Sequence, residues 1–239
     1  MKATKTLFII AMVVLLSACG RKDGTFYLVA QDMTPAAKGV HQFALGPATF
    51  TDAGGTTFTA TEARINVRHI QMDSTDGDQV SIDGPLVFNV LTGTASGGVA
   101  DFAAKKGTYK RVDVRIDDSN VTDGILDPAD PLVGNSLYIT GTHDYGTGGN
   151  FTLVLKFNED IRFEDPNGVE ITDDGSAVLL SLNMAEWMTG VNITTCLETD
   201  ITVDINGDFV IDDNSPASGA CNAIEGDIKS NMKNNYDLK

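Results

Sequence analysis

The residues best suited to chemistry lie in one acidic stretch near the carboxyl end of the chain, which reads DINGDFVIDDNS from Asp204 to Ser215. Hard oxygen donors recur along it at alternate positions, which is the spacing that lets a loop curl around a cation. Ca²⁺ takes about six to eight oxygen ligands, so it is the ion that such a loop would hold. The predicted calcium ligands are Asp204, Asn206, Asp208, the carbonyl of Val210, and Asp212.

The stretch resembles the first part of an EF-hand or dockerin calcium loop that begins at Asp204. Two positions depart from that pattern. Phe209 stands where the sharp turn of the loop requires glycine, and Ser215 stands where a bidentate carboxylate is expected. Asp212 and Asp213 lie close enough in sequence to substitute for that carboxylate.

A hairpin turn is the alternative interpretation of the same residues. Asn206-Gly207 lies between alternating apolar residues, which predicts a type I′ turn joining strands 201–205 and 208–211. The two interpretations are compatible, because a hairpin turn can also carry ligands.

Other polar residues give weaker signals. The histidines (His41, His69 and His143) have no partner at zinc-ligand spacing, and they are expected to be surface or core residues. A second acidic group is interpreted as a solvated loop; it consists of Asp117, Asp118, Asp123, Asp127 and Asp130. Serine-nucleophile and zinc-protease motifs are absent from the sequence, so we expect a protein that is not an enzyme.

The charge of the chain excludes some partners. It has 17 basic and 33 acidic residues, a net charge of −16. Nucleic-acid binding and electrostatic docking on anionic lipid both need basic residues, so neither is expected. The 42% of hydrophobic residues suffices for a sizeable core.

The amino-terminal end carries an export signal. Lys2 and Lys5 precede an apolar run from Leu7 to Leu16, which is shorter than the roughly 20 residues of a membrane span. The following Leu16-Ser-Ala-Cys19 resembles the lipobox of bacterial lipoproteins. The resemblance implies a signal peptide over 1–18, diacylglycerol on Cys19, a lipidated tether over 19–23, and outer-membrane sorting in a Gram-negative envelope, because Gly20 rather than aspartate follows.

The two remaining cysteines, Cys196 and Cys221, form an even pair. Exported proteins meet an oxidising compartment, so we predict a disulfide between them, with two free buried thiols as the alternative. Cys221 also begins an apolar stripe with helical spacing. The stripe predicts a C-terminal helix and contains Cys221, Ile224, Ile228 and Met232.

Many short alternating segments separated by glycine-rich turns predict an antiparallel β-sandwich over 24–190, followed by a disulfide-held segment over 191–239. The strand 62–72 changes parity near Arg68-His69, which predicts a β-bulge. The lone Trp187, within a short helical stretch, is expected to fill the core.

Four stretches, EARINVRHIQM, GPLVFNVLTG, KKGTYKRVDVRID and LNMAEWMTG, resemble a family of bacterial envelope lipoprotein domains of unknown function. The resemblance covers roughly 24–191 and implies an immunoglobulin- or transthyretin-like sandwich, without any known active site. We therefore expect a lipid-anchored binding or scaffolding protein whose partner is an envelope protein or a glycan. The alternatives are a carbohydrate-binding or adhesin module, which calcium would stabilise, and, less favoured, a hydrolase.

Overall fold

The computed structural model describes residues 24–30, 48–92, 94–96, 101–104, 107–171, 177–182, 184–212, 215 and 219–234. The predicted signal peptide, the lipobox with Cys19, and His41 lie outside these residues. The strands are β1 (Gly24–Ala30), β2 (Ala48–Thr51), β3 (Thr57–Ser74), β4 (Gln79–Asn89), β5 (Thr94–Ser96), β6 (Asp101–Ala104), β7 (Gly107–Ile116), β8 (Leu137–His143), β9 (Gly149–Leu155), β10 (Glu159–Ile171), β11 (Ala177–Leu182) and β12 (Phe209–Ile211). The helices are the 3₁₀ turn η1 (Val121–Asp123), α1 (Met184–Trp187), α2 (Ile193–Thr199) and α3 (Ala220–Asn234).

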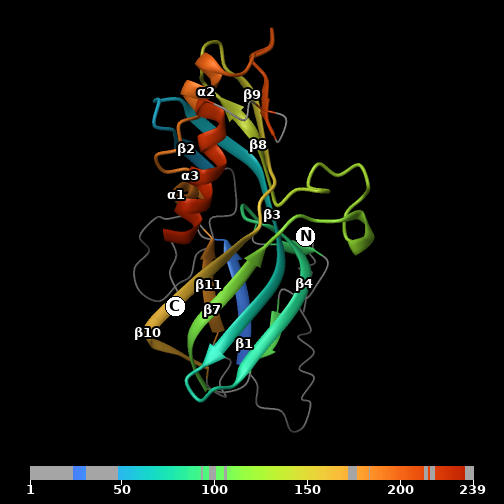
Figure 1. Cartoon of the computed structure of the whole chain (residues 1–239), viewed down its shortest axis with the longest axis vertical. Coiled ribbons are helices and arrows are strands. Elements are labelled where there is room, and N and C mark those ends of the chain that lie inside the picture. Colours follow the sequence, from blue (N-terminus) through green and yellow to red (C-terminus); the bar gives the residue numbers. More distant parts are fainter. Residues whose placement is uncertain are drawn as a thin grey trace, which may run out of the picture.

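The long strand β3 organises the larger of two sheets. Its first half pairs with β2 and β8, and its second half pairs with β4 and β7. The sheet continues from β8 through β9 to β12 on one side, and from β7 to β10 on the other (Figure 1). A second, three-stranded sheet has the order β11-β1-β6. The predicted mainly β, sandwich-like fold is confirmed, although β1–β11 and β9–β12 are parallel pairs, so both sheets are mixed.

The predicted β-bulge in β3 is present. The register of β3 with both β4 and β7 shifts between Val67 and His69. Without the extra residue, the pleat would turn the next apolar side chains outward, because side chains alternate between faces along a strand. With it, Val67, Ile70 and Met72 are all buried, and one strand serves the core along its whole length.

Three helices cover the inner side of the upper half of the large sheet, beside β2 in Figure 1. Trp187 is 2% exposed, so the prediction that it fills the core is confirmed. The predicted helical stripe of α3 is buried as well, and its four side chains join the same hydrophobic cluster as the sheet. The sequence reasoning missed α2, whose seven residues carry Cys196.

Stacked aromatic rings form the upper core. The centroid of the Phe58 ring lies 5.1 Å from the centroid of the stacked Phe50 ring. It lies 5.2 Å from the centroid of the Phe151 ring, which meets it edge to face. Phe209 of β12 joins this cluster, which explains why a three-residue strand is held at the end of the sheet.

Within the described part of the chain, no helix is both long and apolar enough to cross a membrane.

Candidate functional site

The acidic turn at Asp204–Asp208 differs from the predicted type I′ hairpin. The N–H of Gly207 donates to the carbonyl of Asp204 at 3.0 Å, and the N–H of Asp204 donates to the carbonyl of Asp208 at 3.0 Å. Only Gly207, at φ +84°, is left-handed; a type I′ turn would also need a positive φ at Asn206. The prediction of strand 201–205 is also wrong, because β12 pairs in parallel with β9, where Phe209 can enter the core.

Amide N–H groups already donate hydrogen bonds to the two carboxylates that were predicted to bind calcium, those of Asp204 and Asp208. Asp204 Oδ1 accepts from the N–H groups of Asn206 and Asp208, each at 2.8 Å. Asp208 Oδ1 accepts from the backbone N–H and the side-chain Nδ2 of Asn150, at 2.7 and 2.9 Å. Within the described residues, no group of three or more histidine, cysteine, aspartate or glutamate side chains is placed to hold a metal ion. Calcium at this turn stays a prediction.

The remaining two predicted ligands lie along β12 and just after it. Val210 points to solvent with 54% of its surface exposed. The N–H of Asp212 donates to Ser215 Oγ at 3.0 Å, so these two residues form a turn of their own.

The second acidic group belongs to a loop that ion pairs tie to β3. Arg64 Nη1 contacts Asp130 Oδ2 at 2.7 Å, and Arg68 Nη1 contacts Asp123 Oδ2 at 3.0 Å. Burial raises the pKa of Asp130, but the hydrogen bonds from Arg64 and from the N–H of Leu132 outweigh it and leave that pKa below its usual value.

The other acidic side chains of this loop have local partners. Asp117 accepts from Asp118 N–H and from Asn158 Nδ2, and Asp127 accepts from Ala129 N–H. Lys156 Nζ lies 3.6 Å from Asp118 Oδ2. These contacts give each carboxylate of the loop a structural role.

His143 is a core residue, as expected. Its Nε2 donates to the carbonyl of Gly207 at 2.8 Å, and its Nδ1 accepts from Tyr145 N–H at 3.2 Å. The ring packs against Phe58 and Phe209, so His143 ties the acidic turn to the aromatic core. His69 lies at the surface, with Nδ1 2.8 Å from Asp83 Oδ1.

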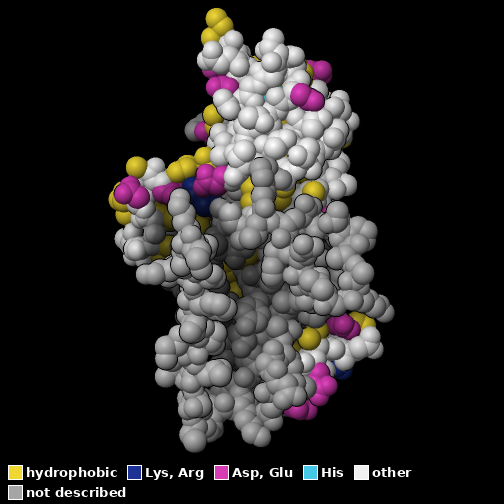
Figure 2. Space-filling model, turned by 180° about the vertical axis from the view of Figure 1, so that it is seen from behind, with side chains coloured by type: hydrophobic (Ala, Val, Ile, Leu, Met, Phe, Trp, Pro, Cys, Tyr) yellow, Lys and Arg dark blue, Asp and Glu magenta, His cyan; other side chains and the backbone are white. Residues whose placement is uncertain are grey.

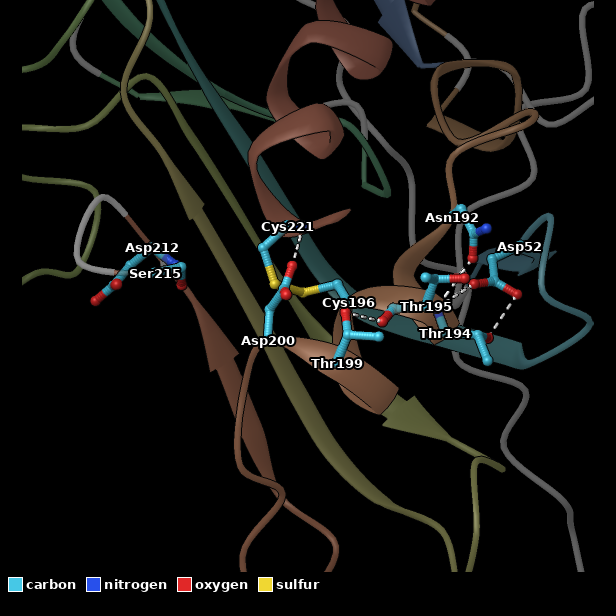
Figure 3. The surroundings of a disulfide bond; sticks show 10 residues. All are labelled: Asp52, Asn192, Thr194, Thr195, Cys196, Thr199, Asp200, Asp212, Ser215 and Cys221. Atoms are coloured by element: carbon cyan, nitrogen blue, oxygen red, sulfur yellow. Dashed lines mark hydrogen bonds between the residues drawn. A yellow bond between two sulfur atoms is a disulfide. The ribbon is translucent and has the colours of Figure 1, made fainter. Parts of the chain in front are cut away.

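The predicted disulfide joins Cys196 of α2 to Cys221 of α3, with the Cα atoms 4.7 Å apart (Figure 3). Asp200, which follows α2, accepts a hydrogen bond from Cys221 N–H at 2.9 Å. This hydrogen bond lowers the pKa of Asp200 below its usual value, because it favours the ionised carboxylate. We call Cys196, Cys221 and Asp200 together the C-terminal clamp.

A buried carboxylate beside the start of α2 was missed by the sequence reasoning. Asp52 is 5% exposed, and it accepts from Thr56 N–H at 2.9 Å. It also accepts from Thr194 N–H at 2.6 Å and from Thr194 Oγ1 at 3.0 Å (Figure 3). Asn192 caps the same helix by accepting from Thr195 N–H at 3.0 Å. Asp52 thus anchors the turn after β2 to the first turn of α2.

The outer side of the upper sheet presents a second feature that the sequence reasoning did not assemble. Threonines project from four neighbouring strands on the side opposite the helices, because their buried neighbours face inward. The alternation of threonine with apolar residues in β2, β3, β8 and β9 was visible, but the register that aligns it was not. We call this surface the threonine face; it consists of Thr49, Thr59, Thr61, Thr140, Thr142 and Thr152.

Comparisons with known proteins place the chain in no family. No protein-family model matches it, and no curated protein matches it. Among solved structures, MbnP from Methylosinus trichosporium aligns with 90% of this chain and 97% of its own, at 12% identity and a TM-score of 0.39. That likeness is too weak to support an argument, so the function must be inferred from the chain itself.

Proposed function

We propose that this protein is a non-enzymatic lipoprotein of the bacterial cell envelope, whose β domain binds or scaffolds a partner while acyl chains on Cys19 hold it at the membrane. The observation that carries the proposal is the lipobox-like Leu16-Ser-Ala-Cys19 at the end of a short apolar run. Two or more acyl chains suffice for stable anchoring.

The charge of the mature chain supports an acyl anchor. Cleavage before Cys19 removes Lys2 and Lys5, leaving 15 basic and 33 acidic residues and a net charge of −18. Such a chain is repelled by anionic lipid headgroups, so the polar surface of the domain contributes little to membrane attachment.

The way the acidic residues are used supports a binding or scaffolding role. Carboxylates of both acidic groups are paired with arginines, lysine, amide side chains or backbone N–H groups of the domain itself; they are those of Asp204, Asp208, Asp118, Asp123 and Asp130. Ion pairs also cross the outer side of the lower sheet, where Arg111 contacts Asp73 and Arg115 contacts Asp160. Carboxylates that are held in such hydrogen bonds and ion pairs suit a rigid binding surface better than proton transfer.

Membrane fractionation of the wild-type protein and Cys19→Ala in a Gram-negative host tests the anchor. Wild-type protein should stay with membranes after a high-salt wash, and Cys19→Ala should be released. Gly20→Asp is the matched control: it should stay lipidated and move from the outer-membrane to the inner-membrane fraction. Membrane retention of Cys19→Ala after the wash would refute the proposal.

A further inference from the structure

Two Asn-Gly pairs, Asn167-Gly168 and Asn206-Gly207, are chemically suited to spontaneous deamidation. In this reaction the backbone nitrogen of the glycine attacks Cγ of the asparagine, and the side-chain nitrogen leaves as ammonia with the glycine N–H proton. Water then opens the succinimide ring to aspartate or isoaspartate, so no other co-reactant is needed. Glycine favours the attack because it has no side chain to hinder it. Both asparagines are exposed and both glycines have positive φ, +74° and +84°, so local geometry does not distinguish the two sites.

Contacts to two neighbouring strands hold the pair at 206–207 in place. Gly207 is buried; its N–H donates to the carbonyl of Asp204, and its carbonyl accepts from His143 Nε2 of β8. A Cβ on Gly149 of β9 would lie 2.4 Å from the carbonyl carbon of Gly207, so the two backbones pack directly on each other. The nitrogen that must attack is therefore engaged, and the turn cannot rearrange until these contacts break.

The pair at 167–168 lies in a bulge of the edge strand β10. Glu164 pairs with Arg111 of β7. The next pair is Val169 with Tyr109, so four residues of β10 face one residue of β7. The four residues cannot all follow the ladder, and the extra ones are left unpaired. Rearrangement of this bulge leaves the pairs on both sides intact, so Asn167 reaches the reactive geometry through local motion alone.

Charge favours reaction at the same site. The attacking nitrogen is an anion once it has lost its proton, so a nearby cation stabilises it and nearby carboxylates oppose its formation. Lys110 is the β7 residue opposite the bulge, and its Cγ lies 3.4 Å from where a Cβ on Gly168 would stand. The strands β8 and β9 and the segment 184–212 contain no lysine or arginine. Seen from behind, the upper end of the molecule instead shows scattered acidic side chains (Figure 2).

From these contacts we propose that Asn167 is a site of spontaneous deamidation and that the fold protects Asn206 from the same reaction. The modification replaces a neutral amide with a carboxylate, and isoaspartate also adds one carbon atom to the backbone. Because residues 165–168 already lie outside the ladder, the fold tolerates the longer backbone, and modified protein accumulates without unfolding.

Peptide mapping of the full-length protein, incubated in detergent at mildly alkaline pH, tests the proposal. Trypsin would leave both asparagines in one peptide, 163–229, whereas cleavage after glutamate of the reduced protein separates them as 165–170 and 199–225. Asn167 should deamidate roughly ten- to hundredfold faster than Asn206, because several net hydrogen bonds must break before Asn206 reacts. In concentrated urea the two rates should converge.

Two variants connect the rates to the contacts. Asp208 Oδ1 accepts two N–H donors of Asn150, so Asp208→Ala should raise the Asn206 rate roughly tenfold and leave the Asn167 rate unchanged. Asn167→Gln should remove the mass change from peptide 165–170. Equal rates at the two sites of the folded protein, a faster reaction at Asn206, or an Asn167 that reacts only in urea would each overturn the proposal.

Discussion

The Asp200 carboxylate accepts a hydrogen bond from the Cys221 backbone N–H at 2.9 Å, so the residue that ends α2 also caps the start of α3. The first four N–H groups of a helix lack partners within it, and an acidic acceptor there also complements the helix dipole. The disulfide to Cys196 links the same two helices one turn earlier in α2. A covalent bond and a charged hydrogen bond thus hold α3 at its amino end.

Reduction of the Cys196–Cys221 disulfide should loosen α3 before the sheet. The bond closes a loop with a sequence separation of 25, which the loop-entropy model values at roughly 3.5 kcal/mol. A single helix of 15 residues is marginal in water, so α3 depends on its buried stripe and on the clamp.

Hydrogen exchange with and without reductant is the measurement for this prediction. The amides of Ile224–Met232 should exchange faster in the reduced protein, while those of β3 and β8 should stay protected. Equal protection of α3 in both states would contradict the prediction, and so would thiol labelling that finds the cysteines free in protein isolated from the envelope.

Gly219→Ala should destabilise the clamp. Gly219 has a φ of +103°, and a methyl group there would lie 2.5 Å from Asp200 Oδ2. Backbone strain of this kind costs about 1–3 kcal/mol, before the displacement of the carboxylate is counted. Urea unfolding should show the loss, and Gly219→Ala should also speed exchange at the first turn of α3.

Gly226→Ala is the matched control within the same helix. It lies inside α3 at an exposed position, and a methyl group there meets nothing within 4 Å. Alanine should stabilise the helix by about 0.5–1 kcal/mol, because glycine is a poor helix former. If both alanine variants changed the unfolding free energy in the same direction, the role given to Gly219 would be wrong.

Local patterns in the sequence predicted local structure well. The parity change near Arg68 predicted the bulge, the spacing from Cys221 to Met232 predicted α3, and the cysteine pair predicted the disulfide. Each prediction rests on a short-range rule about which side chains can share a face. The lipobox lies outside the described residues, so its role stays a prediction.

Long-range pairing explains what the sequence did not reveal. Asn206-Gly207 favours a local hairpin, but Phe209 gains more by entering the aromatic core through β12 and β9. The donors around Asp52 come together only in the fold, because Thr194 is 142 positions away. The threonine face likewise needs the register of four strands, which sequence alone does not specify.

Acid should weaken the attachment of α3 to β10 through Glu159. Burial raises the Glu159 pKa, but the Lys233 and Lys229 side chains outweigh burial and hold that pKa below its usual value. A carboxylate with a lowered folded-state pKa stabilises the fold above its unfolded pKa of about 4.3, and that contribution is lost as pH falls through the folded pKa.

Glu159→Gln should therefore reduce the unfolding free energy at pH 7 by about 1 kcal/mol, and the difference should shrink as the pH falls below the unfolded pKa of about 4.3. Urea titrations at pH 7 and at a series of acidic pH values make the comparison. Glu164→Gln is the control on the same strand; its side chain is 62% exposed, so a much smaller effect is expected. A Glu159→Gln deficit that persists in acid would rule out the ion pairs as the cause.

Calcium at the acidic turn would have to compete with backbone amides. Asp204 Oδ1 is the acceptor for the N–H groups of Asn206 and Asp208, so an ion bound there should shift both amide resonances with a saturating profile. Asp204→Asn removes the charge but keeps an oxygen acceptor, and it should abolish the calcium-dependent shift. Amides that do not respond to millimolar CaCl₂ would refute the calcium prediction.

Asp52→Ala should be among the most destabilising substitutions outside the apolar core. It would leave the N–H groups of Thr56 and Thr194 without their acceptor in a buried place, and each unsatisfied donor costs about 1–3 kcal/mol. Thr194→Val removes only the hydroxyl and should cost about 1 kcal/mol. Urea unfolding should rank Asp52→Ala well below Thr194→Val, with faster exchange at α2 in the former; a reversed order would show that the threonine hydroxyl, rather than the carboxylate, holds α2 to the turn after β2.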